Sequence, residues 1–220
     1  MNMGREITDE FQSVLKAAKI EQKIKRSTFI GNISYCPSIQ KAREFIRSIS
    51  KRYTDATHNC WAYRIITDEG YVSNYSDAGE PSGTAGKPIM DSIESHGLSN
   101  VVVVITRYFG GVKLGIRGLI DAYHLTANLT IEKAGIGRYI LCEEIFLQTT
   151  YTLFSKIRSH LKYLGIDVKE AKIEFSNDVK ITFPVPLSLI KVIEEFLSSL
   201  KSSGKTVQFH LVQQRKGMLL

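Results

Sequence analysis

The sequence has few of the features that mark secreted, disulfide-bonded or membrane proteins. Its 220 residues include only three cysteines, which lie far apart, and this argues against a disulfide framework. No apolar run approaches the roughly 20 residues that a membrane-spanning helix needs. Residues 1–10 lack the apolar core and basic flank of a secretory signal. We therefore expect a cytoplasmic protein with reduced thiols and no membrane segment.

Metal-binding patterns are also missing. The five histidines are scattered, and no pair of cysteines or histidines has the spacing of metal ligands. We expect neither a metal nor a cofactor.

The positive charge is concentrated in one segment. The chain has a net charge of +7. Residues 16–52 hold two acids, Glu21 and Glu44, against ten basic residues: Lys16, Lys19, Lys23, Lys25, Arg26, Lys41, Arg43, Arg47, Lys51 and Arg52. A concentrated basic face suits a polyanionic partner such as RNA. The alternative is a solvated surface that binds nothing.

The first half of the chain predicts a mixture of helices and strands. Residues 4–19 fit a short helix or an extended lead-in, and residues 22–35 alternate like a strand or a bent strand pair. Ser38 is the expected N-cap of a helix whose apolar positions recur at helical spacing. Further expected elements are strands over 59–66, 71–75 and 101–105, the last buried on both faces, and helices over 88–95 and 119–134, the last largely buried.

The second half predicts a separate domain. Strands over 143–151, 206–213 and on both sides of residues 176–178, with helices over 153–164 and 186–203, give the order βαββαβ. We place the boundary near residues 137–142, so the predicted domains are 1–138 and 139–220. The predicted fold class is α+β.

Two glycine-rich runs, Ser76–Pro88 and Arg107–Gly118, are the most informative segments. Glycine clusters mark backbone that turns sharply or is approached closely. The runs carry basic residues, which predicts a rigid, positively lined partner surface. The spacing around Gly86 and Lys87 differs from a nucleotide-binding P-loop, because Pro81 and Pro88 replace the required glycine and hydroxyl residue.

Other candidate chemistry in these segments stays open. Asp77 and Glu80 fit an acid/base pair or a magnesium site, although acids in such turns more often bond their own backbone. Residues 115–118 offer an anion seat at a helix start, or serve only close packing. His58 and Cys60 share a strand face and can form a nucleophilic pair, but a fixed polar anchor and a buried thiol are the simpler interpretation. Tyr108 and Phe109 stack bases, or Phe109 plugs a core.

The glycine-rich runs carry a family resemblance. Ser-Asp-x-Gly-Glu-Pro-Ser-Gly-Thr-Ala-Gly-Lys-Pro, followed by Thr-Arg-Tyr-Phe-Gly-Gly-x-Lys-Leu-Gly, closely resembles the signature of the IMPACT/YigZ family. Lys25–Ile30 and Thr57–Tyr63 also match that family's pattern. The resemblance covers about residues 18–135. Ala78, Ile116 and Arg117 depart from the family pattern, which weakens any carboxylate chemistry at the first run and adds a positive charge at the second.

The resemblance implies an N-terminal domain like the second domain of ribosomal protein S5 and a ferredoxin-like C-terminal domain. Eukaryotic members regulate translation, so it also implies a link to translation. Our leading hypothesis is a non-catalytic protein that binds RNA, the ribosome or a translation-factor partner. Its nucleic-acid contacts are Lys25, Arg26, Arg43, Arg47 and Lys51, and its partner surface comprises Asp77, Glu80, Ser82, Thr84, Lys87, Arg107, Tyr108, Lys113 and Arg117. The alternative is an enzyme for a small phosphorylated or carboxylated metabolite, with a pocket between the glycine-rich runs. The oligomeric state is left open.

Overall fold

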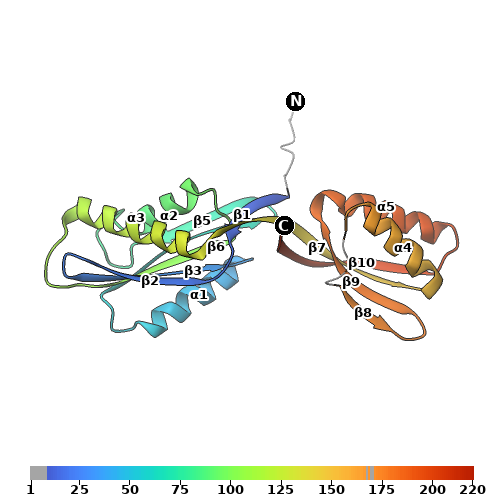
Figure 1. Ribbon diagram of the computed structural model, residues 1–220, viewed down its shortest axis with the longest axis horizontal. Helices are drawn as coiled ribbons and strands as arrows, with labels where there is room; N and C mark the ends of the chain where they lie inside the picture. Colours follow the sequence, from blue (N-terminus) through green and yellow to red (C-terminus); the bar gives the residue numbers. More distant parts are fainter. Residues whose placement is uncertain (1–8, 167, 169–170) are drawn as a thin grey trace, which may run out of the picture. The chain divides into compact units, whose positions relative to one another are not determined.

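A computed structural model describes residues 9–166, 168 and 171–220 of the chain. They form two compact units (Figure 1). The N-terminal unit comprises residues 11–139, and the C-terminal unit comprises residues 140–220 with Asp9 and Glu10. Helices and sheets are mixed in both, which confirms the α+β class.

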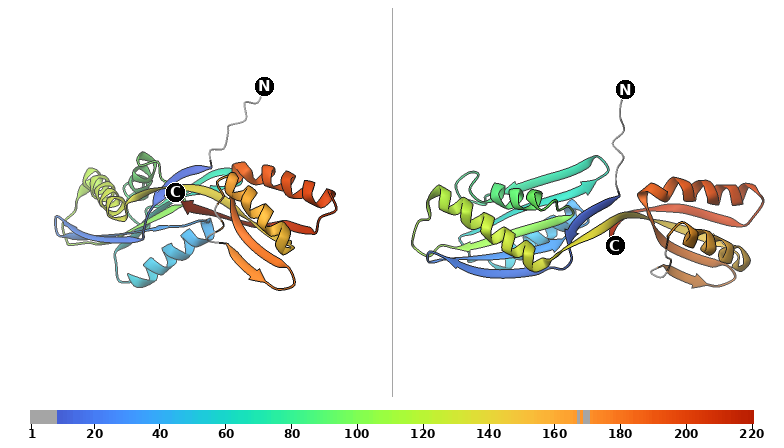
Figure 2. Two further views of the ribbon diagram at one scale, coloured as in Figure 1. Left: turned by 45° about the vertical axis from the view of Figure 1, so that its right-hand side comes forward. Right: turned by 45° about the horizontal axis from the view of Figure 1, so that its top comes forward.

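The N-terminal unit is built on a five-stranded antiparallel sheet in the order β2-β3-β6-β4-β5. Its helices lie on both faces, α2 and α3 on one and α1 on the other (Figures 1 and 2). In chain order the elements are β2 (Ala18–Ile24), β3 (Ser27–Tyr35), α1 (Ile39–Arg52), β4 (His58–Thr67), β5 (Gly70–Ser76), α2 (Gly86–Ser95), β6 (Val101–Tyr108) and α3 (Gly115–Ala134). The lead-in is extended, because β1 (Glu10–Val14) precedes β2, so the helix alternative is wrong from residue 9 onward. Residues 4–8 lie outside the described part.

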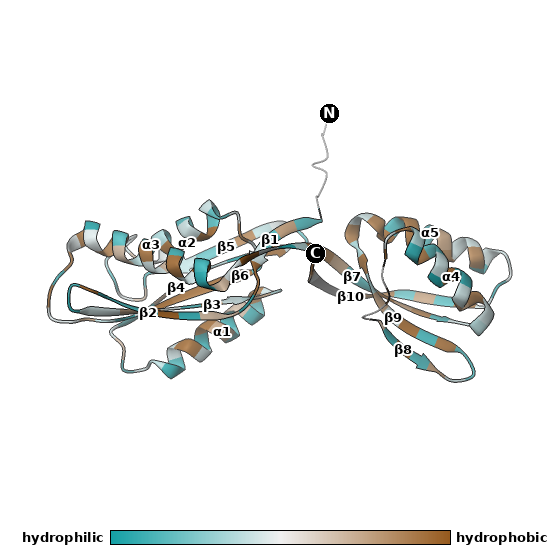
Figure 3. Ribbon diagram, in the orientation of Figure 1, coloured by the Kyte–Doolittle hydropathy of each residue, from teal (hydrophilic) through white to brown (hydrophobic). Residues whose placement is uncertain are grey.

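Strand β6 is apolar along its length because both of its faces contact a core (Figure 3). Val101, Val103 and Ile105 face the core under α2 and α3, whereas Val102 and Val104 face the core under α1. Every residue from Val101 to Arg107 is buried. The predicted burial on both faces is confirmed.

Helix α1 begins where the sequence predicts. The Ser38 side chain accepts a hydrogen bond from the backbone N–H of Lys41, and Ala42 and Ile49 are buried against the sheet. Helix α3 is less buried than predicted. Leu125 and Leu129 remain 46% and 36% exposed, because α3 packs on the sheet through only part of its circumference.

The C-terminal unit has the element order βαββαβ. The elements are β7 (Ile136–Thr149), which enters this unit at residue 140, α4 (Tyr151–Tyr163), β8 (Lys172–Phe175), β9 (Val179–Pro186), α5 (Leu187–Ser202) and β10 (Val207–Leu219). Strands β7 and β8 pair antiparallel with β9, and β10 pairs with β7. Helices α4 and α5 show alternating polar and apolar stripes (Figure 3), and their apolar residues join the sheet in one core.

We predict that Ser38→Ala lowers the free energy of unfolding by about 1 kcal/mol, because it removes the N-cap of α1. Urea denaturation measures the change. Ser48→Ala is the control, since Ser48 lies inside the same helix and does not cap it. An equal loss in both variants would contradict the capping role.

Candidate functional site

The loop between β5 and α2 is organised by one carboxylate. The two oxygens of Asp77 accept hydrogen bonds from the backbone N–H groups of Gly83, Ala85 and Gly86, at 2.9, 3.0 and 2.8 Å. Ala85 and Gly86 lie at the start of α2 and Gly83 lies in the turn before it, so Asp77 caps the helix and closes the turn. The interpretation that an acid in this turn bonds its own backbone is confirmed for Asp77.

Because Asp77 caps α2, the start of this helix is not free to bind a phosphate. The N–H groups that would face an anion already face Asp77. Gly86 is required for close packing, because a Cβ there would lie 2.7 Å from the backbone of Ser76. Lys87 is exposed, and its ammonium pairs with Asp91 at 2.9 Å, which raises the pKa of Lys87.

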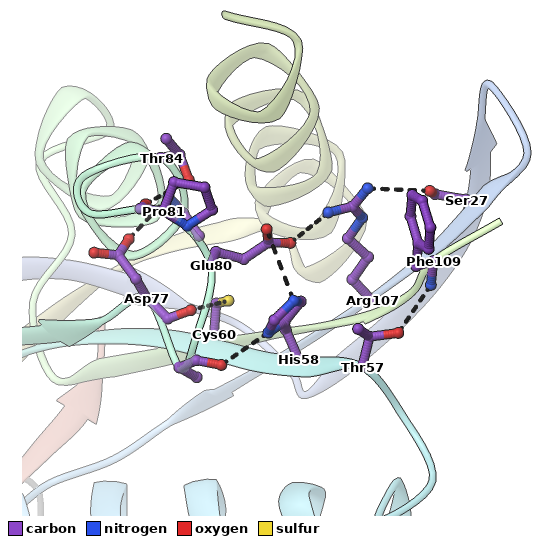
Figure 4. Close-up of polar contacts among 12 residues, drawn as sticks. Ser27, Thr57, His58, Cys60, Asp77, Glu80, Pro81, Thr84, Arg107 and Phe109 are labelled. Atoms are coloured by element: carbon purple, nitrogen blue, oxygen red, sulfur yellow. Dashed lines mark hydrogen bonds and ion pairs between the residues drawn. The ribbon is translucent and has the colours of Figure 1, made fainter. Parts of the chain in front are cut away.

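A buried ion pair joins the two glycine-rich runs (Figure 4). Arg107 Nη1, at the end of β6, lies 2.7 Å from Glu80 Oε1, and both side chains are buried. The hydroxyl of Tyr123, on α3, donates to the same oxygen at 2.9 Å. The pair therefore ties the loop after β5 to the sheet and to α3. The role of Tyr123 was missed from the sequence, where it is only one apolar position of a helix.

The Arg107 guanidinium lies among aromatic rings. Its central carbon is 5.5 Å from the Phe29 ring centroid and 5.4 Å from that of Phe109. Nη2 donates to Ser27 Oγ at 3.3 Å, while Nε has no hydrogen-bond partner within the described residues. Phe109 is still 45% exposed, so it covers the guanidinium without being a core residue.

The β2–β3 turn packs against the second glycine-rich run. Lys25 and Arg26 both have positive φ, 47° and 44°, as in a two-residue hairpin turn. A Cβ on Gly110 would lie 1.8 Å from the Arg26 carbonyl oxygen, so only glycine fits there. Both basic side chains of the turn are exposed.

His58 and Cys60 do not form a nucleophilic pair. His58 Nδ1 donates to the Ala78 carbonyl at 2.9 Å, and its Nε2 lies 3.9 Å from Glu80 Oε2. Cys60 Sγ donates to the Asp77 carbonyl at 2.9 Å. Burial raises the pKa of the Cys60 thiol to about 12, so the thiol stays protonated near neutral pH. His58 is the polar anchor that the simpler interpretation expects.

The partner surface predicted on the glycine-rich runs needs correction. Glu80, Thr84 and Arg107 are buried, because the ion pair and the tight turn draw them inward. Tyr108 is half-buried and donates to Asp55 at 2.8 Å. Exposed members of the predicted set are Ser82, Lys87, Lys113 and Arg117, and Arg117 pairs with Asp121. The two runs therefore do not form a continuous positively lined surface.

The basic segment, in contrast, faces solvent. All five predicted nucleic-acid contacts are exposed: Lys25, Arg26, Arg43, Arg47 and Lys51. The same holds for the other five basic residues of 16–52. Across residues 16–52, which are all described, Lys41 alone forms an ion pair, with Glu44 at 2.8 Å.

Two further properties concern metals and membranes. The described residues contain no cluster of three or more His, Cys, Asp or Glu side chains suited to a metal ion. None of the helices that the structure describes is long and apolar enough to cross a membrane.

Comparison with known proteins identifies the family. Residues 25–131 match the Impact N-terminal domain. The chain is 34% identical over 194 residues to IMPACT family member YvyE of Bacillus subtilis (strain 168), covering 88% of each chain. It is 32% identical over 143 residues to IMPACT family member YigZ of Escherichia coli (strain K12), covering 64% of this chain and 70% of the relative. A crystal structure of a hypothetical protein matches with a TM-score of 0.64 at 25% identity, over 91% of this chain and 96% of that one. The chain belongs to the IMPACT family.

We predict that Glu80→Gln lowers the free energy of unfolding by about 3–5 kcal/mol, because it leaves the Arg107 charge buried without its partner. The double variant Glu80→Leu/Arg107→Met should recover part of that loss, since no charge remains buried. Urea denaturation measures both. Glu94→Gln, an exposed acid on α2, is the control. A double variant that loses as much free energy of unfolding as Glu80→Gln, or more, would contradict the coupling.

The buried thiol of Cys60 makes the free energy of unfolding depend on pH. The pKa of Cys60 rises from its ordinary 9.0 to about 12 in the folded chain, so above pH 9 the unfolded state releases this proton first. We therefore predict that the free energy of unfolding falls between pH 9 and pH 12, by about 1.4 kcal/mol per pH unit for this thiol. Cys60→Ala should flatten the profile by that slope, as measured by urea denaturation from pH 8 upward. Parallel profiles for the variant and the unchanged chain would rule out this contribution.

Proposed function

We propose that this chain is a non-catalytic cytoplasmic regulator associated with translation, and that it binds RNA or the ribosome through its N-terminal unit. The observation that carries the proposal is the basic surface of β2, the β2–β3 turn and α1. Nine basic side chains are exposed there, and only one of them, Lys41, is paired with an acid. Such a surface attracts a polyanion strongly, because little of its charge is neutralised within the chain.

The link to translation rests on the IMPACT family, whose eukaryotic members the sequence resemblance associates with translational control. The proposal includes the domain assignments that the resemblance implies. A ferredoxin-like C-terminal unit is supported by its βαββαβ order and by β7 and β8 flanking β9. For the N-terminal unit, an S5-like fold is an expectation from the family.

The hydrogen bonds of the two candidate acids, Asp77 and Glu80, favour a non-catalytic role over an enzymatic one. Asp77 accepts three backbone hydrogen bonds, and Glu80 accepts from Arg107 and Tyr123. Both carboxylates are thus occupied in holding the loops. General acid/base catalysis needs a carboxylate within reach of a substrate proton.

We predict that the chain co-sediments with ribosomes from lysate at low ionic strength and is released as salt rises. Arg43→Glu/Arg47→Glu should weaken this binding at least about tenfold and reduce its salt dependence, because two exposed phosphate contacts become repulsive. Quantitative sedimentation across a salt series measures both effects.

The matched control reverses two exposed basic residues of α4, Lys156→Glu/Arg158→Glu, and should leave binding unchanged. Equal effects of the two double variants would mean that net charge alone governs binding. No co-sedimentation of the unchanged chain at any salt concentration would overturn the ribosome proposal.

A further inference from the structure

A groove runs along one side of α1 on the sheet face that this helix shares with β2 and β3. Helix α1 packs over β4 and β6 through the core that includes Tyr63, Val102 and Val104. A pocket of about 310 Å³ lies between the helix and β2–β3. A second pocket of about 580 Å³ adjoins it, and the two share Phe45 and Ser48.

Asn32 of β3 lines the smaller pocket and is only 4% exposed. Its side-chain nitrogen has no hydrogen-bond partner among the described residues. Buried polar groups are nearly always paired, so an unpaired amide donor in a residue that lines a pocket is unusual, and an acceptor brought by a bound molecule would satisfy it.

Two cations flank this donor. Lys19 of β2 is the direct cross-strand neighbour of Asn32, so both side chains are on the same sheet face. Arg52, at the end of α1, lines the same pocket from the helix side. Both residues are exposed, and Lys19 Nζ lies 5.6 Å from the centroid of the Tyr53 ring. No acid is among the residues that line this pocket.

The partly buried Phe45 completes the lining. The pocket thus combines one buried donor, an aromatic ring and two cations. A nucleotide in a single strand presents the matching chemistry, because its base has carbonyl or ring-nitrogen acceptors and a stacking face, and phosphates follow on both sides.

We propose that this groove binds single-stranded RNA, with a base edge accepting from the Asn32 amide and phosphates held by Lys19 and Arg52. The inference rests on the proposed function, and it deepens that function by naming the site and the form of the nucleic acid. The groove-lining side of α1 differs from the side of Arg43 and Arg47, which line neither pocket. Those two residues then provide general attraction around the site.

The test is fluorescence anisotropy of a labelled 12-residue oligouridine RNA with the full chain. Asn32→Leu should weaken binding about tenfold, because the base loses one hydrogen bond to a buried donor. It should not lower the melting temperature, since leucine has nearly the same shape and removes an unpaired amide. Lys19→Ala/Arg52→Ala, at exposed positions that folding tolerates, should reduce the log–log salt slope by about 1.4. The control Lys156→Ala/Arg158→Ala should leave affinity and slope unchanged.

Unchanged affinity in Asn32→Leu, an unchanged salt slope in Lys19→Ala/Arg52→Ala, or no binding by the unchanged chain would each overturn the inference. Competition by uridine 5′-monophosphate at the same nucleotide concentration would overturn the choice of a strand over a free nucleotide. Ribosome sedimentation judges the proposed function separately. Ribosome binding that survives Asn32→Leu and Lys19→Ala/Arg52→Ala would reject the groove alone. Oligouridine binding that depends on Asn32, without ribosome binding, would support the groove and reject the ribosome as partner.

Discussion

The buried ion pair between Glu80 and Arg107 is the constraint on which the N-terminal unit depends. Two charges removed from water are tolerated only when they are paired and hydrogen-bonded. Here the carboxylate also accepts from Tyr123, and the guanidinium donates to Ser27 and lies near two aromatic rings. The ion pair and its hydrogen bonds therefore join four segments: the loop after β5, the end of β6, α3 and the start of β3.

This constraint draws Glu80 and Arg107 of the glycine-rich runs away from solvent, so they cannot belong to an exposed binding surface. Across the runs, Glu80 and Arg107 neutralise each other, and glycine allows close backbone approach at Gly86 and Gly110. The basic side chains of β2, the β2–β3 turn and α1 are exposed, and Lys41 alone among them is paired with an acid. The glycine-rich loops brace the fold, and we propose that the basic surface with its groove beside α1 binds the partner.

Features set by local chemistry were predictable from the sequence. Ser38 caps α1, Asp77 bonds its own turn, and the unbroken apolar run of β6 is buried on both faces, since each signal lies within a few residues. Contacts between distant segments of the chain were not predictable from the sequence. Glu80 and Arg107 are 27 positions apart and meet only through the tertiary fold, so both were expected on a partner surface. Asn32 carries no signal in an alternating strand, because its unpaired state depends on what surrounds it.

The most direct test is hydrogen exchange measured by mass spectrometry, with and without the 12-residue oligouridine RNA. The account predicts that RNA slows exchange in peptides covering β2 and α1, residues 18–24 and 39–52, and leaves peptides from the loops at 77–85 and 109–114 unchanged. Slower exchange confined to those two loops, with β2 and α1 unaffected, would contradict the account.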